Sequence, residues 1–243
     1  MENKLEKNIS KFDQDILDFS GYKYTSSKQL SSKFSNRRIT DEILLLADIK
    51  DKQVIDVGCG DGTYTEELLK GKPKMIIGID PAGQAISHAK KGNKYKKIQY
   101  LKANIYSLDK LNRHFDVAVV RGVLHHLDDY KKAIEQLSKI ADQIIVVEPN
   151  GYNVALKIIE KVSKYHREHG EKSYPPNDLD NQFKLNGCEI VLSKYCGLVP
   201  FFCPDFLAIF LKKIEPLVEN TPILNKISCA VYIQKIKKCL ISL

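Results

Sequence analysis

The stretch that decides the fold of this chain is Val54-Ile-Asp-Val-Gly-Cys-Gly-Asp-Gly-Thr-Tyr64. Its first residues, Val54 to Val57, form a mainly apolar run that is typical of a buried parallel strand. Three glycines follow at alternate positions, Gly58, Gly60 and Gly62. Glycine is needed where the backbone takes a positive φ or lets a ligand approach closely, and ligands bind at the carboxyl ends of strands in open α/β sheets. We therefore predict a small-molecule site at these glycines.

The chain after residue 52 alternates strand patterns with helix patterns. Predicted strands are 53–57, 75–80, 97–102, 115–121, 144–148, 189–195 and 227–234. Predicted helices are 65–69, one that Pro81 opens, 130–140 and 154–162. Strands separated by helices in this way indicate an α/β fold, a doubly wound and mostly parallel sheet of seven strands with a Rossmann-like arrangement.

The first fifty residues indicate an N-terminal helical extension, which we call the preface. Apolar residues between Phe12 and Phe19 have near-helical spacing, and a helix is expected over 39–49 with Thr40-Asp41 as its cap. Tyr22 and Tyr24 lie in the polar stretch between them. They either fold over a ligand as a lid or pin the preface onto the core.

We expect residues 51–243 to form the main domain, with residues 1–50 as an extension or lid. Residues 163–186 and 198–226 are expected to be insertions that cap the substrate, the latter a helical cap between the last strands. Residues 198–211 are more apolar than a surface crossover should be. They can cap the cavity, form a homodimer face, touch a membrane or pack as a core helix.

The composition is that of a globular protein, with 243 residues of which 43% are hydrophobic and 28% charged. The sequence shows neither a signal peptide nor a membrane span. The six cysteines form no CxxC pair and no zinc-ligand spacing, which favours buried thiols, a reducing compartment and therefore a cytoplasmic protein. The net charge is +8, but the lysines are scattered among acidic residues, which favours a solvated surface over a nucleic-acid face.

Two carboxylates narrow the class of ligand. Asp56 precedes the glycines, where it would repel a pyrophosphate but attract a cation, and the spacing lacks the third glycine of the dinucleotide fingerprint GxGxxG. Asp80 ends the second predicted strand, where it can accept hydrogen bonds from a ribose diol. A ligand with a ribose and a positively charged tail fits better than one with phosphates.

These residues resemble the class I S-adenosylmethionine-dependent methyltransferases over about residues 52–148, and the seven-strand count extends the likeness to the C-terminus. The resemblance implies that the loop at Gly58, Cys59, Gly60 and Gly62 wraps the methionine part of S-adenosyl-L-methionine and that Asp56 holds its amino end. It implies that Asp80 binds the ribose. It places Pro81, and Asn104 with Ile105 where many members carry an acidic residue, near the adenine.

The segment Arg121-Gly-Val-Leu-His-His-Leu127 resembles the family's variable fourth motif, which lies beside the sulfonium. Arg121 is accordingly counted among the cofactor-binding residues. Because methyl transfer from a sulfonium requires alignment of the nucleophile and removal of its proton, His125 or His126 is our candidate base. One histidine of such a pair commonly packs inward instead.

The remaining polar residues predict substrate contacts. Glu148 and Asn150 at the end of the fifth predicted strand face the same cleft by topology, and Tyr165, His166 and His169 belong to a dense polar segment that suits a lid. No spacing indicates a metal site. The predicted function is methyl transfer to an oxygen or nitrogen of a small molecule, which can be anionic, sugar-like or lipid-linked. The alternatives are an NAD(P)-dependent oxidoreductase and a non-catalytic cofactor-binding partner of a biosynthetic complex.

Overall fold

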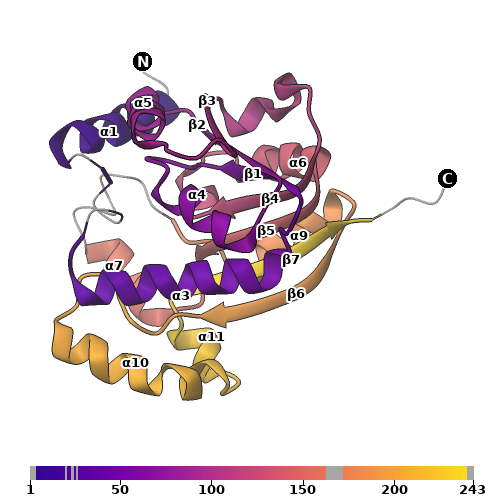
Figure 1. The fold of residues 1–243 in the computed structure, drawn as a ribbon. Coiled ribbons are helices and arrows are strands. Elements are labelled where there is room, and N and C mark those ends of the chain that lie inside the picture. Colours follow the sequence, from indigo (N-terminus) through magenta and orange to yellow (C-terminus); the bar gives the residue numbers. More distant parts are fainter. Residues whose placement is uncertain (1–3, 20, 23–24, 26, 163–171, 240–243) are drawn as a thin grey trace.

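The computed structural model describes residues 4–19, 21–22, 25, 27–162 and 172–239. Within them a seven-stranded sheet has the order β3-β2-β1-β4-β5-β7-β6 (Figure 1). The strands are β1 (Gln53–Val57), β2 (Met75–Asp80), β3 (Ile98–Lys102), β4 (Phe115–Arg121), β5 (Ala141–Pro149), β6 (Cys188–Cys196) and β7 (Val231–Lys238). Strands β1 to β5 pair in parallel, and β7 runs antiparallel between β5 and β6. The predicted mostly parallel sheet is confirmed.

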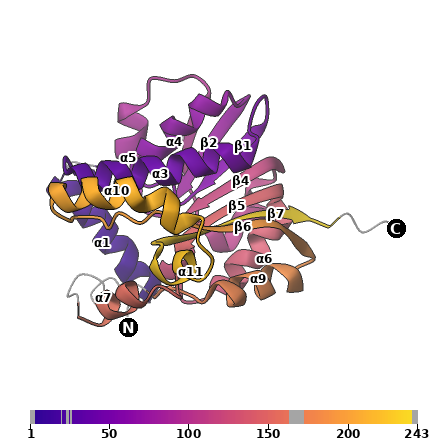
Figure 2. The ribbon, with the colours of Figure 1, turned by 90° about the horizontal axis from the view of Figure 1, so that it is seen from below.

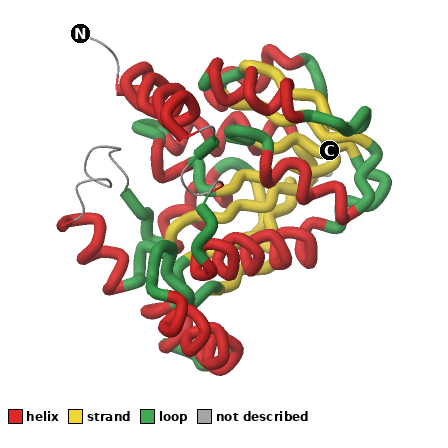
Figure 3. The backbone as a smooth tube through the Cα atoms, turned by 60° about the vertical axis from the view of Figure 1, so that its left-hand side comes forward, coloured by secondary structure: helices red, strands yellow, loops and turns green. Residues whose placement is uncertain are grey.

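Helices cover both faces of the sheet (Figures 1 and 3). The α-helices are α1 (Lys4–Phe19), α3 (Leu30–Ala47), α4 (Thr63–Glu67), α5 (Gly83–Gly92), α6 (Tyr130–Ile140), α7 (Val154–Val162), α9 (Pro176–Leu185), α10 (Asp205–Glu219) and α11 (Leu224–Ser228). Short 3-10 helices are η1 (Leu68–Gly71), η2 (Ile105–Leu111) and η3 (Leu124–His126). One core cluster joins the sheet to α6 and α9, and a second joins it to α3 and α5. Because strand side chains alternate, Ile55 contributes to the first cluster and Val54 to the second.

The strand order reverses at β1. The chain passes from β1 to β2 and β3 on one side and then returns to place β4 on the other side. In a doubly wound sheet, the crevice outside the carboxyl ends of the two strands at such a reversal is the usual ligand site. The glycines after β1 and the histidines after β4 therefore converge at one edge of the sheet.

Three helix starts differ from those predicted, and the first is that of α4, which begins at Thr63 rather than Thr65. Helix α3 begins at Leu30, so Thr40 and Asp41 lie inside it and do not cap it. The polar run hides this start because the helix buries small serines, Ser31, Ser32 and Ser35, against its neighbours. Helix α5 begins at Gly83, after Pro81 rather than at it.

The last strand also differs from its predicted bounds. Strand β7 runs from Val231 to Lys238, whereas residues 227–228 close the short helix α11. The predicted strand began too early because the apolar residues of α11 shortly precede those of β7 in the sequence. Among the described residues, no helix is long and apolar enough to cross a membrane.

Candidate functional site

The glycine loop after β1 is approached from two sides. Gly58 and Gly60 take φ values of +77° and +54°, which favour glycine. A Cβ on Gly58 would lie 2.4 Å from Val123 Cγ2, and one on Gly60 would lie 2.3 Å from Tyr22 Cε2. The loop thus needs glycine both for its backbone conformation and for the close approach of these two side chains.

A cavity of about 370 Å³ opens at this loop, within the size range of small-molecule sites. Ten of the predicted site residues line it: Tyr22, Gly58, Cys59, Gly60, Asp80, Pro81, Arg121, His125, His126 and Glu148. They come from the preface, β1, β2, β4 and β5. The fold therefore brings together residues that lie more than one hundred positions apart in the chain.

Asp80 is held at the rim of the loop by two backbone donors. Its Oδ2 accepts a hydrogen bond from the Gly60 N–H at 3.1 Å, and its Oδ1 accepts one from the Ala82 N–H at 2.8 Å. Burial raises the pKa of Asp80 to about 6, although these two N–H groups oppose the shift. Each carboxylate oxygen retains a lone pair for a ligand, so Asp80 is a fixed acceptor in the cavity wall.

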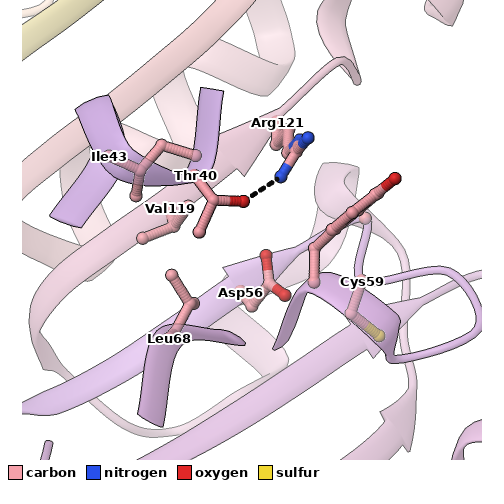
Figure 4. Close-up of a pocket in the computed structure, with 9 residues that line it drawn as sticks. Thr40, Ile43, Asp56, Cys59, Leu68, Val119 and Arg121 are labelled. Carbon is pink, nitrogen blue, oxygen red and sulfur yellow. Dashed lines mark hydrogen bonds between the residues drawn. The ribbon is translucent and has the colours of Figure 1, made fainter. Parts of the chain in front are cut away.

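Asp56 lies behind the loop, in a separate cavity of about 40 Å³ (Figure 4). Its Oδ2 accepts a hydrogen bond from Thr65 Oγ1 at 2.6 Å, and burial raises the pKa of Asp56 to about 6. This small cavity shares Gly58, Cys59, Tyr64 and Arg121 with the larger one. Asp56 does not line the larger cavity.

Arg121 ends β4 and lines both cavities. Its Nη1 donates to Thr40 Oγ1 at 3.0 Å and its Nη2 donates to Asn36 Oδ1 at 2.9 Å, both on α3. The guanidinium also stacks over the Tyr64 ring at 3.7 Å from the ring centre. Burial lowers the pKa of Arg121. Helix α3 thus holds a half-buried cation beside the glycine loop (Figure 4).

Glu148 organises the loop that carries the two histidines. Its Oε1 accepts hydrogen bonds from the Val123 and Leu124 N–H groups at 2.9 and 2.8 Å, and its Oε2 accepts one from the His125 N–H at 3.1 Å. The Oε2 atom also lies 2.8 Å from His125 Nδ1. Because an ionised carboxylate only accepts, the ring donates through Nδ1 and keeps Nε2 as its basic nitrogen. The glutamate is 1% exposed.

His126 packs among aromatic rings in the same wall. Its ring centre lies 3.9 Å from that of His125 and 5.1 Å from that of Phe12 on α1. Phe12 in turn contacts Tyr22 edge to face at 5.7 Å. The two histidines therefore differ in surroundings: one is tied to a carboxylate and the other is enclosed by rings.

The preface is fastened to the glycine loop by Asp61. Asp61 Oδ2 accepts hydrogen bonds from the Tyr22 N–H at 3.0 Å and from Thr25 Oγ1. Burial raises the pKa of Tyr22, and the carboxylates of Asp80 and Asp61 raise it further. Sequence reasoning missed Asp61, although its position between Gly60 and Gly62 is a signal that it lies at the site.

Four predicted residues among those described lie outside the large cavity besides Asp56: Gly62, Asn104, Ile105 and Asn150. Gly62 faces Tyr100, Asn104 caps η2 by accepting from the Tyr106 N–H, and Ile105 is buried in the core. Asn150 is 0% exposed, and its Nδ2 donates to the Lys226 and Cys229 carbonyls, so it ties β5 to α11. Tyr24, Tyr165, His166 and His169 lie outside the described residues.

The sequence did not predict the individual residues that line the remaining, far part of the cavity. Its lining includes the apolar side chains Leu156, Phe201 and Val231. The carboxylate of Glu160 also lines it, bonded to Lys157 Nζ at 3.1 Å and to the Ser173 N–H at 3.0 Å. No sequence motif marks these positions, since they come from three separate elements. Within the described part of the chain, no group of three His, Cys, Asp or Glu residues could hold a metal ion.

Known proteins resemble this chain in sequence and in fold. A ubiquinone biosynthesis O-methyltransferase, mitochondrial, of Dictyostelium discoideum is 27% identical over 201 residues, which cover 70% of this chain and 60% of that protein. A tRNA U34 carboxymethyltransferase of Campylobacter fetus subsp. fetus (strain 82-40) is 34% identical over 96 residues, which cover 37% of this chain and 33% of that protein. The chain thus spans less than two thirds of the length of both relatives.

Solved structures share the fold at low sequence identity. Magnesium protoporphyrin IX methyltransferase (ChlM) from Synechocystis PCC 6803 with bound SAH has a TM-score of 0.66 at 13% identity, covering 96% of this chain and 100% of that chain. The [4+2]-cyclase SpnF has a TM-score of 0.65 at 14% identity, covering 96% and 93%. Because one neighbour is named a cyclase, the fold alone does not define the reaction.

The family is defined by sequence. A family profile described as a methyltransferase domain matches residues 31–193, which is more than half of the chain. This match favours S-adenosylmethionine over the nicotinamide cofactor of the alternative prediction. The chain belongs to the methyltransferase domain family and has the fold of the class I S-adenosylmethionine-dependent methyltransferases.

Proposed function

We propose that this protein transfers a methyl group from S-adenosylmethionine to an oxygen or nitrogen of a small molecule with an apolar body. The observation that carries the proposal is the hydrogen bond between His125 Nδ1 and Glu148 Oε2, 2.8 Å long, in the wall of the cavity that the glycine loop also lines. The pair combines a basic imidazole with a buried carboxylate that orients it. Bound S-adenosylmethionine would supply the activated methyl group.

The chain's own residues fit this cofactor. Glycines at 58 and 60 leave the loop without side chains, and the fixed carboxylate of Asp80 provides acceptors suited to ribose hydroxyls. The Arg121 guanidinium, held by Asn36 and Thr40, provides a cation suited to an amino-acid carboxylate. Carboxylate and guanidinium therefore complement the two ends of the cofactor.

His125 would act as the general base. The carboxylate of Glu148 stabilises the imidazolium that forms when the ring takes a proton. It also fixes the position of the ring, because its two oxygens accept from three successive backbone N–H groups of the same loop. His126, which packs against the rings of Phe12 and His125, would form part of the cavity wall beside the methyl acceptor.

The lining of the far part of the cavity supports an acceptor with an apolar body. Leu156, Phe201 and Val231 offer it apolar contacts, and Glu160 offers a hydrogen-bond acceptor. This favours a lipid-linked or aromatic hydroxyl compound over a sugar. That the acceptor is not a nucleic acid and that the protein is cytoplasmic are still predictions. One relative is named for tRNA, and another is named as mitochondrial.

The preface and the two insertions would complete the site. Tyr22 and Phe12 line the cavity, which supports a lid formed by residues 1–50. Ser173 lines it from the insertion 163–186 and Phe201 from the insertion 198–226, which supports the proposed caps.

A panel of acceptors tests the reaction. The protein is incubated with S-adenosylmethionine and, in separate reactions, hydroxylated aromatic compounds, polyprenylated phenols, sugars or tRNA, and release of S-adenosylhomocysteine is measured. We expect product only with acceptors that have an apolar body. Methylation of tRNA alone would contradict the proposal, and cofactor binding without turnover on any acceptor would favour the non-catalytic alternative.

A further inference from the structure

Helix α10 has its apolar side chains on the outside. Phe206, Phe210 and Leu217 are 77%, 57% and 71% exposed, and their spacing of four and seven places them on one stripe of the helix. The opposite stripe is buried and carries Glu215 and Glu219. A surface helix normally has its apolar side chains toward the core and its charged ones toward solvent. Packing against the core therefore does not account for the exposed apolar stripe of α10.

The buried stripe of α10 is fixed by ion pairs. Arg38 Nη2 lies 2.6 Å from Glu219 Oε2, and Arg38 Nη1 lies 2.5 Å from Glu42 Oε1 on its own helix α3. Lys212 pairs with Glu215. Since the Arg38–Glu219 pair joins α3 to the charged side of α10, the apolar stripe of α10 faces away from the protein.

Helices α7 and α11 extend this outward apolar surface. Neither helix has a buried residue. On α7, Val154, Ile158 and Val162 are exposed and share a stripe, while on α11 and just before it Ile223 and Ile227 are exposed. Helix α11 contacts both α7 and α10, and Figure 2 shows it between them. We call the outward sides of these three helices the apolar face.

The apolar face is connected to the wall of the cavity. Helix α7 turns Leu156 and Glu160 inward to line the cavity and the stripe of Val154 outward. Phe201 lines the cavity just before α10, and Ala230 lines it just after α11. The cavity wall therefore includes α7 itself and the chain segments that adjoin α10 and α11.

Charge on the apolar face selects its partner. The exposed charged residues of the three helices are Lys161, Lys213 and Lys226, with Asp205 as the one exposed acid among them. A second copy of the chain would bring these lysines against a face that has few acids, because a twofold contact joins identical surfaces. Anionic lipid headgroups complement the lysines, and the acyl region complements the phenylalanines.

We infer that α7, α10 and α11 seat this protein on an anionic lipid bilayer, so that an amphipathic acceptor enters the cavity from the membrane. The seating is a peripheral one, in the headgroup region. The identity of the acceptor as a membrane lipid rests on the proposed function, whereas the seating itself does not.

Vesicle flotation tests the seating with the full chain. Vesicles are made of phosphatidylcholine alone or with about one third phosphatidylglycerol. We expect the protein to float with the anionic vesicles and the double variant Phe206→Ser/Phe210→Ser to lose on the order of tenfold or more of its partitioning. Leu185→Ser is the matched control, since Leu185 is 77% exposed and ends α9 shortly before β6 begins, at the amino edge of the sheet and away from the site.

Charge and folding are controlled separately. Lys213→Glu/Lys226→Glu should remove the preference for anionic vesicles. S-adenosylhomocysteine affinity, measured by calorimetry, should be unchanged in the phenylalanine variant, which shows that its fold and cofactor site are intact. The inference is overturned if the wild-type protein floats with neither vesicle, if the double variant floats as well as the wild type, or if light scattering shows a dimer that this variant dissociates. Vesicle binding by a protein that methylates nothing would refute the proposed function alone.

Discussion

Glu148 and His125 form a buried pair in which the carboxylate holds both the ring and the backbone of the same histidine. The pair joins two neighbouring parallel strands at their carboxyl ends, since Glu148 belongs to β5 and His125 follows β4. An imidazole placed this way has its tautomer and its position set by one residue.

Replacing Glu148 with Gln should lower kcat strongly while cofactor affinity stays within a few-fold of the wild type. The amide is neutral and places an N–H group or a weaker acceptor against His125 Nδ1, so the imidazolium loses its stabilising charge. We expect a loss of about 10²-fold to 10⁴-fold in kcat. The rate is measured at saturating acceptor over a range of pH.

The histidine variants separate base from wall. His125→Gln should resemble Glu148→Gln, and the double variant should be little worse than either, because the residues act as a unit. His126→Gln should chiefly raise KM. Equal loss of kcat in both single histidine variants would contradict the assignment of roles.

Gly60→Ala should weaken cofactor binding through Tyr22. The new Cβ would lie 2.3 Å from Tyr22 Cε2, and a residue at φ +54° costs about 1–2 kcal/mol when it is not glycine. Adding Tyr22→Ala should relieve the clash but not the backbone cost. Gly92→Ala is the control, because a Cβ there meets nothing within 4 Å, and it should change stability by about 1 kcal/mol or less. Calorimetry with S-adenosylhomocysteine and thermal unfolding give both quantities.

Acidification should act in opposite directions on the free protein and on cofactor binding. The pKa values of Asp56 and Asp80 are both raised to about 6 by burial. A carboxylate whose pKa is raised by folding opposes folding while it is ionised. These two groups therefore add to the free energy of unfolding as the pH falls from above 6 toward 4.

In the proposed function Asp80 accepts hydrogen bonds from the cofactor as an ionised carboxylate, so cofactor affinity should fall over the same pH range. The shift in Tm that saturating S-adenosylhomocysteine produces should be smaller at about pH 5 than at about pH 7.5. Asp80→Asn should show little of this dependence. A ligand-induced shift that grows on acidification would contradict the assignment.

Asn150→Ala should destabilise the fold without changing cofactor affinity. The amide donates to two carbonyls and accepts from the Tyr152 N–H, all in a site that is closed to solvent. Loss of these bonds should cost about 1–3 kcal/mol. Denaturant unfolding measures the cost, with the exposed Asn181→Ala as control; an unaltered stability together with a raised KM for acceptor would instead indicate a substrate contact.

The central strands of the parallel sheet were predictable because most of their residues are apolar on both faces, and β1, β2 and β4 have the predicted bounds. The glycine loop was predictable because its conformation excludes other residues. The start of α3 was not, since its buried serines read as a polar linker. Likewise, the apolar residues of α10 suggest a core helix in the sequence. Only the ion pairs of Arg38 show that the charged side of α10 faces inward.

The roles of the remaining site residues could not be predicted, because they depend on hydrogen bonds between positions that are distant in the sequence. Glu148 was expected to orient the substrate, yet its bonds go to residues 123–125, a contact that depends on the register of β4 against β5. Asn150 reaches α11 more than seventy positions away. In both cases the residue type indicated a polar role, and only the packing of two elements decides which one.

Calorimetric titration of the Asp80→Asn variant with S-adenosylmethionine tests whether the cofactor is held between the glycine loop and the end of β2. Wild-type protein should bind S-adenosylmethionine and not NAD, and Asp80→Asn should lose about 1.5–3 kcal/mol of binding free energy through one charge-assisted contact. The exposed Asp109→Asn serves as control and should bind as the wild type does. Unchanged affinity in Asp80→Asn, or binding of NAD alone, would contradict the account.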